Sequence, residues 1–175
     1  MSEEVRFETT GVLDDAFFKE NAKYLLSSKY YLKRLILGIL LTVLILAEVV
    51  WLSMPSMLIV LAIYWGMYYP LTLLYQRRAA KILIKRQREA YPDGRCEIVT
   101  SCVEEGVRCE NRTSGGTVVV DYAHLSTMAL AKHAYILMSK ASQFTVFFTD
   151  GLTEQEKTDL QAYLREKCPK LKIIR

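Results

Sequence analysis

The sequence has few of the residues that build catalytic and metal centres. Its 175 residues include two histidines and four cysteines, and no two cysteines form a Cys-x-x-Cys pair. The ligand spacing typical of zinc sites is therefore missing. No glycine-rich phosphate loop occurs either, because Gly115-Gly116 is expected to form a hairpin loop. We expect no cofactor, no metal and no enzymatic activity.

The cysteines and histidines favour structural interpretations. His133 falls in a predicted turn, and His124 has no evident nucleophilic or carboxylate partner. Two of the cysteines share one side of a predicted strand, which is typical of small buried apolar residues. We expect all four thiols to be reduced, because a cytoplasmic location disfavours disulfides. These thiols belong to Cys96, Cys102, Cys109 and Cys168.

Charge is almost absent from residues 35–74, where Glu48 is the single ionisable acid or base. Basic residues flank this region on both sides: residues 29–34 have a net charge of +3, and residues 75–95 have a net charge of +5. A nucleic-acid-binding protein would spread its cations over a folded surface. The confinement of the basic excess to two short blocks therefore argues against a nucleic-acid partner.

The region of low charge predicts a transmembrane hairpin of two helices, residues 35–54 and 57–75. Each run is long enough for a helix to cross about 30 Å of hydrocarbon. The linker around Pro55-Ser56 is short and uncharged, so the two helices are expected to be antiparallel neighbours. Short basic flanks stay in the cytoplasm. We thus predict a multi-pass protein of the plasma membrane with both termini cytoplasmic and no signal peptide.

A basic stripe is predicted on the helix that continues from the second span through the stalk, residues 76–95. Its five members fall within about 100° of one another at 3.6 residues per turn. They are expected to contact anionic lipid head groups, or only to set the orientation of the hairpin. The stripe consists of Arg77, Arg78, Lys81, Lys85 and Arg88.

Glu48 is the second candidate for a functional residue, since an acid inside a membrane is costly. Trp51, three residues later, fits an interfacial aromatic belt, so Glu48 could reach the outer head groups. Alternatively, a bend centred on Pro55-Ser56 brings Glu48 level with position 63, and Tyr64 could then donate a hydrogen bond to it.

Period-two alternation after the turn Pro92-Asp93-Gly94 predicts six short strands within residues 96–149. Glu104-Glu105-Gly106 is expected to be a hairpin turn whose glycine supplies a positive φ. Residues 5–10 are expected to form a further strand that joins this sheet. Asp14 and Asp15 are expected to start a helix that carries Phe17, Phe18, Ala22 and Leu25.

A capping box at Thr153 and Glu156 predicts a closing helix over residues 153–168. The predicted fold class is an α+β membrane protein, in which a cytoplasmic antiparallel β-barrel or roll, capped by this helix, follows the hairpin. The predicted parts are an N-terminal strand and helix (1–34), the hairpin (35–75), the stalk (76–95) and the β-rich domain (96–175).

This layout resembles the YcxB-like family of small bacterial membrane proteins, most clearly in the stretch DYAHLSTMALAKHAYILMSKASQFTVFFTDGLTEQEKTDLQAYL, residues 121–164. Tyr122 stands where the family usually has tryptophan, and Phe148-Thr149-Asp150-Gly151 stands where a Pro-Lys pair usually precedes the helix. The resemblance implies a C-terminal domain similar to bacterial pleckstrin-homology-like modules, and it implies no catalytic residue.

Two functions from different classes remain open. The chain could be a membrane-anchored binding or scaffold module that presents its cytoplasmic domain to a protein partner or to lipid. Alternatively, it could be a subunit of a membrane complex in which the hairpin itself is the interface. The expected partners are membrane lipids, an unknown protein and, in a homo-oligomer, further copies of the chain.

Overall fold

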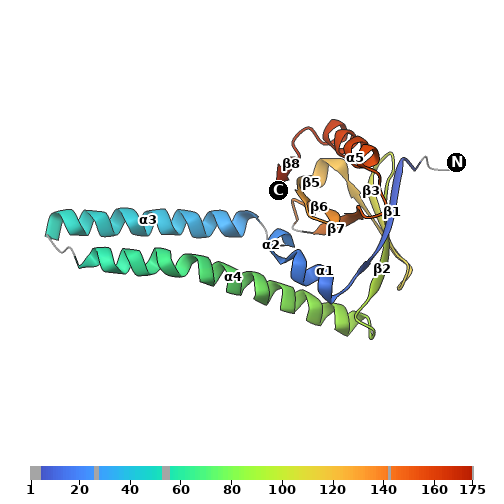
Figure 1. Cartoon of the computed structure of the whole chain (residues 1–175). Helices are drawn as coiled ribbons and strands as arrows, with labels where there is room; N and C mark the ends of the chain where they lie inside the picture. The colour runs from blue at the N-terminus through green and yellow to red at the C-terminus, as the bar shows by residue number, and fades with distance from the viewer. Residues whose placement is uncertain (1–4, 26–27, 53–55, 142, 175) are drawn as a thin grey trace.

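The computed structural model describes residues 5–25, 28–52, 56–141 and 143–174. Two β-sheets and several short helices form one body, and two long helices extend from it side by side (Figure 1). The first strand, β1 (Phe7–Leu13), and the last, β8 (Lys172–Ile174), both belong to this body. The two ends of the described chain therefore lie at the same end of the long helices.

The first sheet is antiparallel and has the strand order β1-β2-β3-β4. β1 pairs with β2 along its whole length, from Phe7 opposite Cys102 to Leu13 opposite Cys96. The prediction that the N-terminal strand joins the sheet is confirmed. The other strands of this sheet are β2 (Cys96–Cys102), β3 (Gly106–Asn111) and β4 (Gly116–Asp121).

Gly106 starts β3 for a different reason from the one expected. Positive φ angles among the described glycines occur at Gly94 (62°) and Gly115 (74°), and Gly106 does not share this conformation. A Cβ on Gly106 would lie 2.3 Å from the carbonyl oxygen of Val120 on the neighbouring strand. Glycine is therefore required because the two backbones approach closely, and the predicted positive φ was wrong.

The second sheet has the order β7-β6-β5-β8, and β8 runs parallel to β5. The other two strand pairs of this sheet, β5 with β6 and β6 with β7, are antiparallel. β8 was not predicted, because three residues are too few to show alternation. A short 3₁₀ helix, η1 (Tyr122–His124), leads from β4 into this sheet. Its strands are β5 (Leu125–Leu130), β6 (Ala134–Ser139), β7 (Phe144–Phe148) and β8.

All six residues of β6 are buried because the strand separates two hydrophobic clusters. Tyr135 and Leu137 contact the cluster that includes α5, and Ile136 and Met138 contact the cluster that includes α1. Successive side chains of a strand point to opposite faces. The uninterrupted apolar run AYILM thus fits a strand covered on both sides.

The described strands form two separate sheets and no barrel closes, so the predicted barrel was wrong. β1 and β7 do lie side by side where the sheets meet. However, the Phe148 backbone N–H donates to the side-chain Oγ1 of Thr9 (3.2 Å) instead of to a backbone carbonyl. The Phe148 ring lies over Gly11 at the same place. A side chain therefore occupies the space in which a continuous ladder would form.

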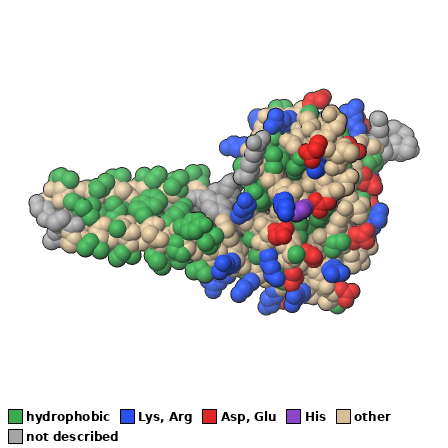
Figure 2. Space-filling model, in the orientation of Figure 1, with side chains coloured by type: hydrophobic (Ala, Val, Ile, Leu, Met, Phe, Trp, Pro, Cys, Tyr) green, Lys and Arg blue, Asp and Glu red, His purple; other side chains and the backbone are tan. Residues whose placement is uncertain are grey.

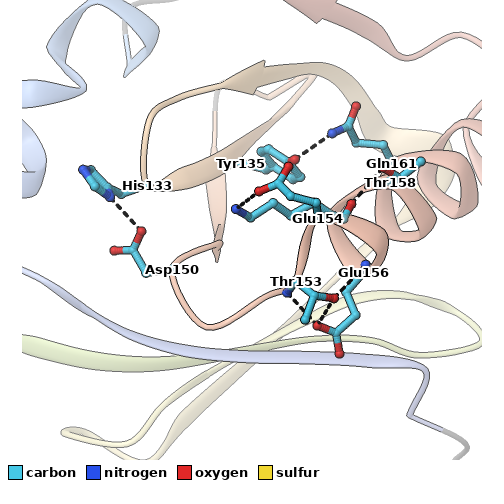
Figure 3. Close-up of polar contacts among 9 residues, drawn as sticks. His133, Tyr135, Asp150, Thr153, Glu154, Glu156, Thr158 and Gln161 are labelled. Carbon is cyan, nitrogen blue, oxygen red and sulfur yellow. Dashed lines mark hydrogen bonds and ion pairs between the residues drawn. The ribbon is translucent and has the colours of Figure 1, made fainter.

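The closing helix α5 (Glu154–Lys167) confirms the predicted capping box. The Thr153 hydroxyl accepts from the Glu156 N–H (3.3 Å), and the Glu156 carboxylate accepts from the Thr153 N–H (2.7 Å) (Figure 3). Leu160 and Leu164 on the apolar face are completely buried against the sheets. This burial, more than the cap, fixes the helix on the sheets.

The predicted N-terminal helix is present but is divided into α1 (Asp15–Glu20) and α2 (Ala22–Leu25). Asp14 caps α1, since its carboxylate accepts from the Phe17 N–H at 2.8 Å. Asn21 ends α1, and its buried side-chain amide donates to the Phe17 carbonyl at 2.9 Å. The division lets both short helices pack along α4 (Met57–Ala90).

The long helices are α3 (Ser28–Leu52) and α4, and α3 lies beside the first part of α4 (Figure 1). The Trp65 indole N–H donates to the Thr42 hydroxyl at 3.2 Å. Gly38 permits this approach, because a Cβ there would lie 3.2 Å from the Tyr64 hydroxyl. We call the part of the pair formed by residues 35–52 and 57–75 the helical arm.

Of the residues that the structure describes, one helix, α4, is long and apolar enough to cross a membrane. None of its apolar window is buried. The apolar part of α3, Leu35–Trp51, is shorter, about 25 Å at 1.5 Å per residue. The end of the predicted first span and Pro55 of the linker lie outside the described residues. The predicted two-span transmembrane hairpin is therefore not shown, because only one of its two helices, among the described residues, has the length and composition that a span needs.

Candidate functional site

The basic stripe lies where the helical arm meets the sheets, and Figure 2 shows Lys and Arg side chains gathered at this junction. α4 continues as one helix through Ala90, so the predicted stalk is helical up to that residue. All five side chains of the stripe are exposed. A helix of this length keeps residues three and four positions apart on one face, as the sequence predicted.

Ion pairs divide the stripe into two parts. Arg88 Nη2 lies 2.5 Å from Asp15 Oδ2 on α1, and Lys85 Nζ lies 3.7 Å from Glu89 Oε1. The remaining members, Arg77, Arg78 and Lys81, have no ion pair within the described residues. The cations nearest the apolar part of α4 are thus the ones whose charge no acid in the described chain balances.

Arg88 has a structural role that the sequence did not indicate. Together with the Gln87 side chain, which donates to the Leu13 carbonyl at 3.3 Å, it ties the end of α4 to α1 and β1. The pair with Asp15 is partly exposed and contributes about 1 kcal/mol or less. Its effect is to hold α1 beside α4, which positions Lys19 one turn further along α1.

A groove of about 380 Å³ runs between α4 and the α1–α2 segment. We call it the α2–α4 groove. Its cations are Lys19, Arg77 and Lys81, and its apolar lining includes Ala22, Leu73, Ala80 and Ile84. Sequence reasoning missed Lys19, because the folding of α1 back onto α4 joins residues about sixty positions apart.

Glu48 and Tyr64 are not brought together. Glu48 is exposed on α3, and no hydrogen bond within the described residues joins it to Tyr64. Because Thr42 lies level with Trp65, antiparallel counting places Glu48 level with Ile59, about 7 Å along the axis from Tyr64. The Tyr64 hydroxyl instead lies beside Gly38.

Three of the four thiols are buried, as predicted, and Cys109 is half-buried. Burial raises the pKa of Cys102 from its ordinary value of 9.0 to about 12, although a hydrogen bond with Tyr122 opposes the shift. Burial likewise raises the pKa of Cys168 to about 11. Both thiols are protonated at neutral pH and are poor nucleophiles. Among the described residues, no group of three or more His, Cys, Asp or Glu side chains could hold a metal ion.

One polar side-chain contact lies between two loops that sequence reasoning treated as independent. His133 Nδ1 lies 2.7 Å from Asp150 Oδ1, and the Thr149 N–H donates to the His133 carbonyl at 3.0 Å (Figure 3). Both side chains are exposed. The contact joins the β5–β6 turn to the segment that precedes α5, and it brings no nucleophile with it.

The free edge of β4 is the most exposed part of the sheets. β4 is last in its sheet, so its outer edge pairs with no described strand. Val118 and Val119 point to opposite faces, yet they are 58% and 43% exposed. The sequence predicted this strand but not its position at an edge, which depends on the pairing of all four strands.

No family model matches the chain, and no curated protein matches it. The resemblance to the YcxB-like family stays a prediction.

Proposed function

We propose that this chain is a membrane-anchored binding module, whose helical arm inserts into the bilayer and whose sheets bind a protein partner. The observation that carries the proposal is the belt of exposed apolar side chains on the arm, one face of which is seen in Figure 2. Leu44 on α3 and Ile59 on α4 are 62% and 63% exposed, and most of their apolar neighbours are also exposed.

The belt supports a lipid environment rather than a buried helix. Water-soluble monomers rarely expose contiguous apolar patches of more than a few hundred Å². The sheets have their own core and do not cover the arm. The unbalanced cations Arg77, Arg78 and Lys81 follow directly after the apolar residues of α4, where anionic head groups would meet them.

The free edge of β4 supports the binding part of the proposal. An edge strand offers unpaired N–H and C=O groups to another extended chain. Natural proteins usually protect such edges with charge or proline, whereas Thr117-Val118-Val119-Val120 contains neither. We therefore assign partner binding to this edge, and a non-enzymatic role agrees with the protonated, buried thiols.

The proposed location is the plasma membrane, with both termini in the cytoplasm and the α3–α4 connection outside. Two observations support this orientation: the two basic blocks, and the position of both described chain ends in the sheets. We extend the proposal to a YcxB-like identity and a pleckstrin-homology-like domain, which the two sheets and the α5 cap support.

The test combines membrane extraction with reporter fusions. Alkaline carbonate should leave the full chain in the membrane pellet, because apolar burial and not surface charge retains it. Reporters at residues 28 and 95 should both give a cytoplasmic signal, and one inserted at Ser56 should give an external signal. Extraction into the supernatant, or an external signal at residue 95, would contradict the anchor.

One observation favours the alternative of a membrane-complex subunit. Glu48 and Trp51, which is 91% exposed, share the outward face of α3. A carboxylate on that face would be stabilised by a second protein or by another copy of the chain. Replacing the arm by an unrelated helical hairpin discriminates the two proposals: the binding module keeps its partner, and the complex subunit loses it.

A further inference from the structure

The α2–α4 groove combines an apolar lining with cations along one side. Leu73, Ala80 and Ile84 are spaced seven and four residues apart and therefore share one face of α4. Ala22 on α2 and Ala80 on α4 are both buried, and their small side chains leave the space between the helices open. The groove is thus formed by two segments that the chain brings together only on folding.

The positive charge in the groove is not balanced by the described chain. Lys19, Arg77 and Lys81 have no ion pair among the described residues, and no acid lines the groove. Of the acids on α1 and α4, Asp15 and Glu89 are paired with Arg88 and Lys85, and Glu20 at the end of α1 does not line the groove. An anion would therefore complete the site.

The position of the groove defines the rest of the ligand. From Leu73 to Ile84 it extends along α4 by about 16 Å at 1.5 Å per residue. It begins in the apolar part of the helical arm and ends among the cations. A ligand that follows it needs an apolar tail on the side of Leu73 and a negative group near Arg77 and Lys81.

We propose that the α2–α4 groove binds one anionic phospholipid, with its phosphate held by Lys19, Arg77 and Lys81 and an acyl chain against Leu73 and the two alanines. This inference rests on the proposed membrane anchor. It differs from general attraction of the basic stripe to a charged surface, because Lys19 belongs to α1 and lies outside the stripe, whereas Arg78 belongs to the stripe and does not line the groove.

The experiment uses the full chain in nanodiscs of phosphatidylcholine with phosphatidylglycerol, and native mass spectrometry counts the phosphatidylglycerol retained per protein after release. Lys19→Gln and Lys81→Gln should each lower lipid affinity about fivefold, the equivalent of about 1 kcal/mol per cation. The matched controls are Lys23→Gln on α2 and Arg78→Gln on α4, which remove the same charge outside the groove and should change the affinity less than twofold.

Equal losses in the groove variants and the controls would overturn the groove and leave only a diffuse basic surface. Inorganic phosphate at millimolar concentration should not displace the lipid, and full displacement would show that the acyl chain contributes nothing. Carbonate extraction of the same variants separates the two proposals. Retention in the pellet together with equal lipid losses rejects the groove alone, whereas loss from the pellet rejects the anchor and the groove with it.

Discussion

Gly11 lies directly beneath the ring of Phe148, so close that a Cβ on the glycine would fall 2.2 Å from the ring. The contact joins β1 of one sheet to β7 of the other, next to the hydrogen bond from the Phe148 N–H to Thr9. No side chain larger than hydrogen fits at position 11 unless the ring moves.

The first prediction concerns this contact. Gly11→Ala should lower the free energy of unfolding by about 1–3 kcal/mol, the range typical of overpacking, as measured by chemical denaturation of the full chain in detergent. Gly151→Ala is the control, because a Cβ there meets nothing within 4 Å. Adding Phe148→Leu should recover part of the loss. Equal stabilities for the two glycine variants would contradict the prediction.

The second prediction concerns alkaline pH. The Cys102 thiol ionises near pH 9.0 in the unfolded chain, but its folded pKa is about 12. The folded protein therefore holds one more proton between these values, and its stability should fall as the pH rises, by at most about 1.4 kcal/mol per unit from this thiol. Cys102→Ala should make the decline shallower between pH 9 and 12. If the slope of stability against pH is the same in this variant, folding does not raise the pKa of Cys102 and the prediction is wrong.

The third prediction concerns the start of α5. Thr153→Ala removes an N-cap and should destabilise the protein by about 1 kcal/mol. Thr158→Ala is the matched control, since its exposed hydroxyl donates only to the Glu154 carbonyl within the helix, and alanine favours the helix. Hydrogen bonds from Thr153 lower the pKa of Glu156, so the contribution of its carboxylate should disappear as the pH falls through this lowered pKa. Thermal unfolding that does not distinguish the two threonine variants would exclude the cap as a source of stability.

The fourth prediction concerns the edge of β4. A photo-crosslinking amino acid at Val118 should give a discrete adduct in living cells, because an extended partner would cover that position. Glu104, exposed in the β2–β3 turn, is the control and should give none. Identical patterns from both positions would show that β4 is not a binding edge. Val119→Lys should abolish the adduct from position 118 without affecting membrane extraction.

Local patterns in the sequence predicted the elements whose boundaries depend on neighbouring residues. Alternation predicted β2 to β7, and Thr153 with Glu156 predicted the start of α5. What could not be predicted depends on distant partners. β8 exists because Lys172–Ile174 pairs with β5, and Gly106 is glycine because the Val120 carbonyl lies against it.

The candidate site was likewise predicted only where it depends on residues close together in the sequence. Helical periodicity placed Arg77 and Lys81 on one face of α4, but it could not indicate that Lys19 would join them. The predicted pairing of Glu48 with Tyr64 depended on the centre of the hairpin bend. The contact between Thr42 and Trp65 instead places Glu48 level with position 59, about four residues from the expected position 63.

α4 continues from the apolar arm to Ala90, and the turn at residues 91–95 is all that separates it from β2. Bonds from Gln87 and Arg88 fasten this end to β1 and α1. The sheets are therefore joined to the arm by a continuous helix and by these contacts, with no flexible linker between them. In a bilayer the sheets would then rotate about the membrane normal together with the arm. The β4 edge would then be presented at a constant height and tilt, and a partner in the same membrane would search for it in two dimensions instead of three.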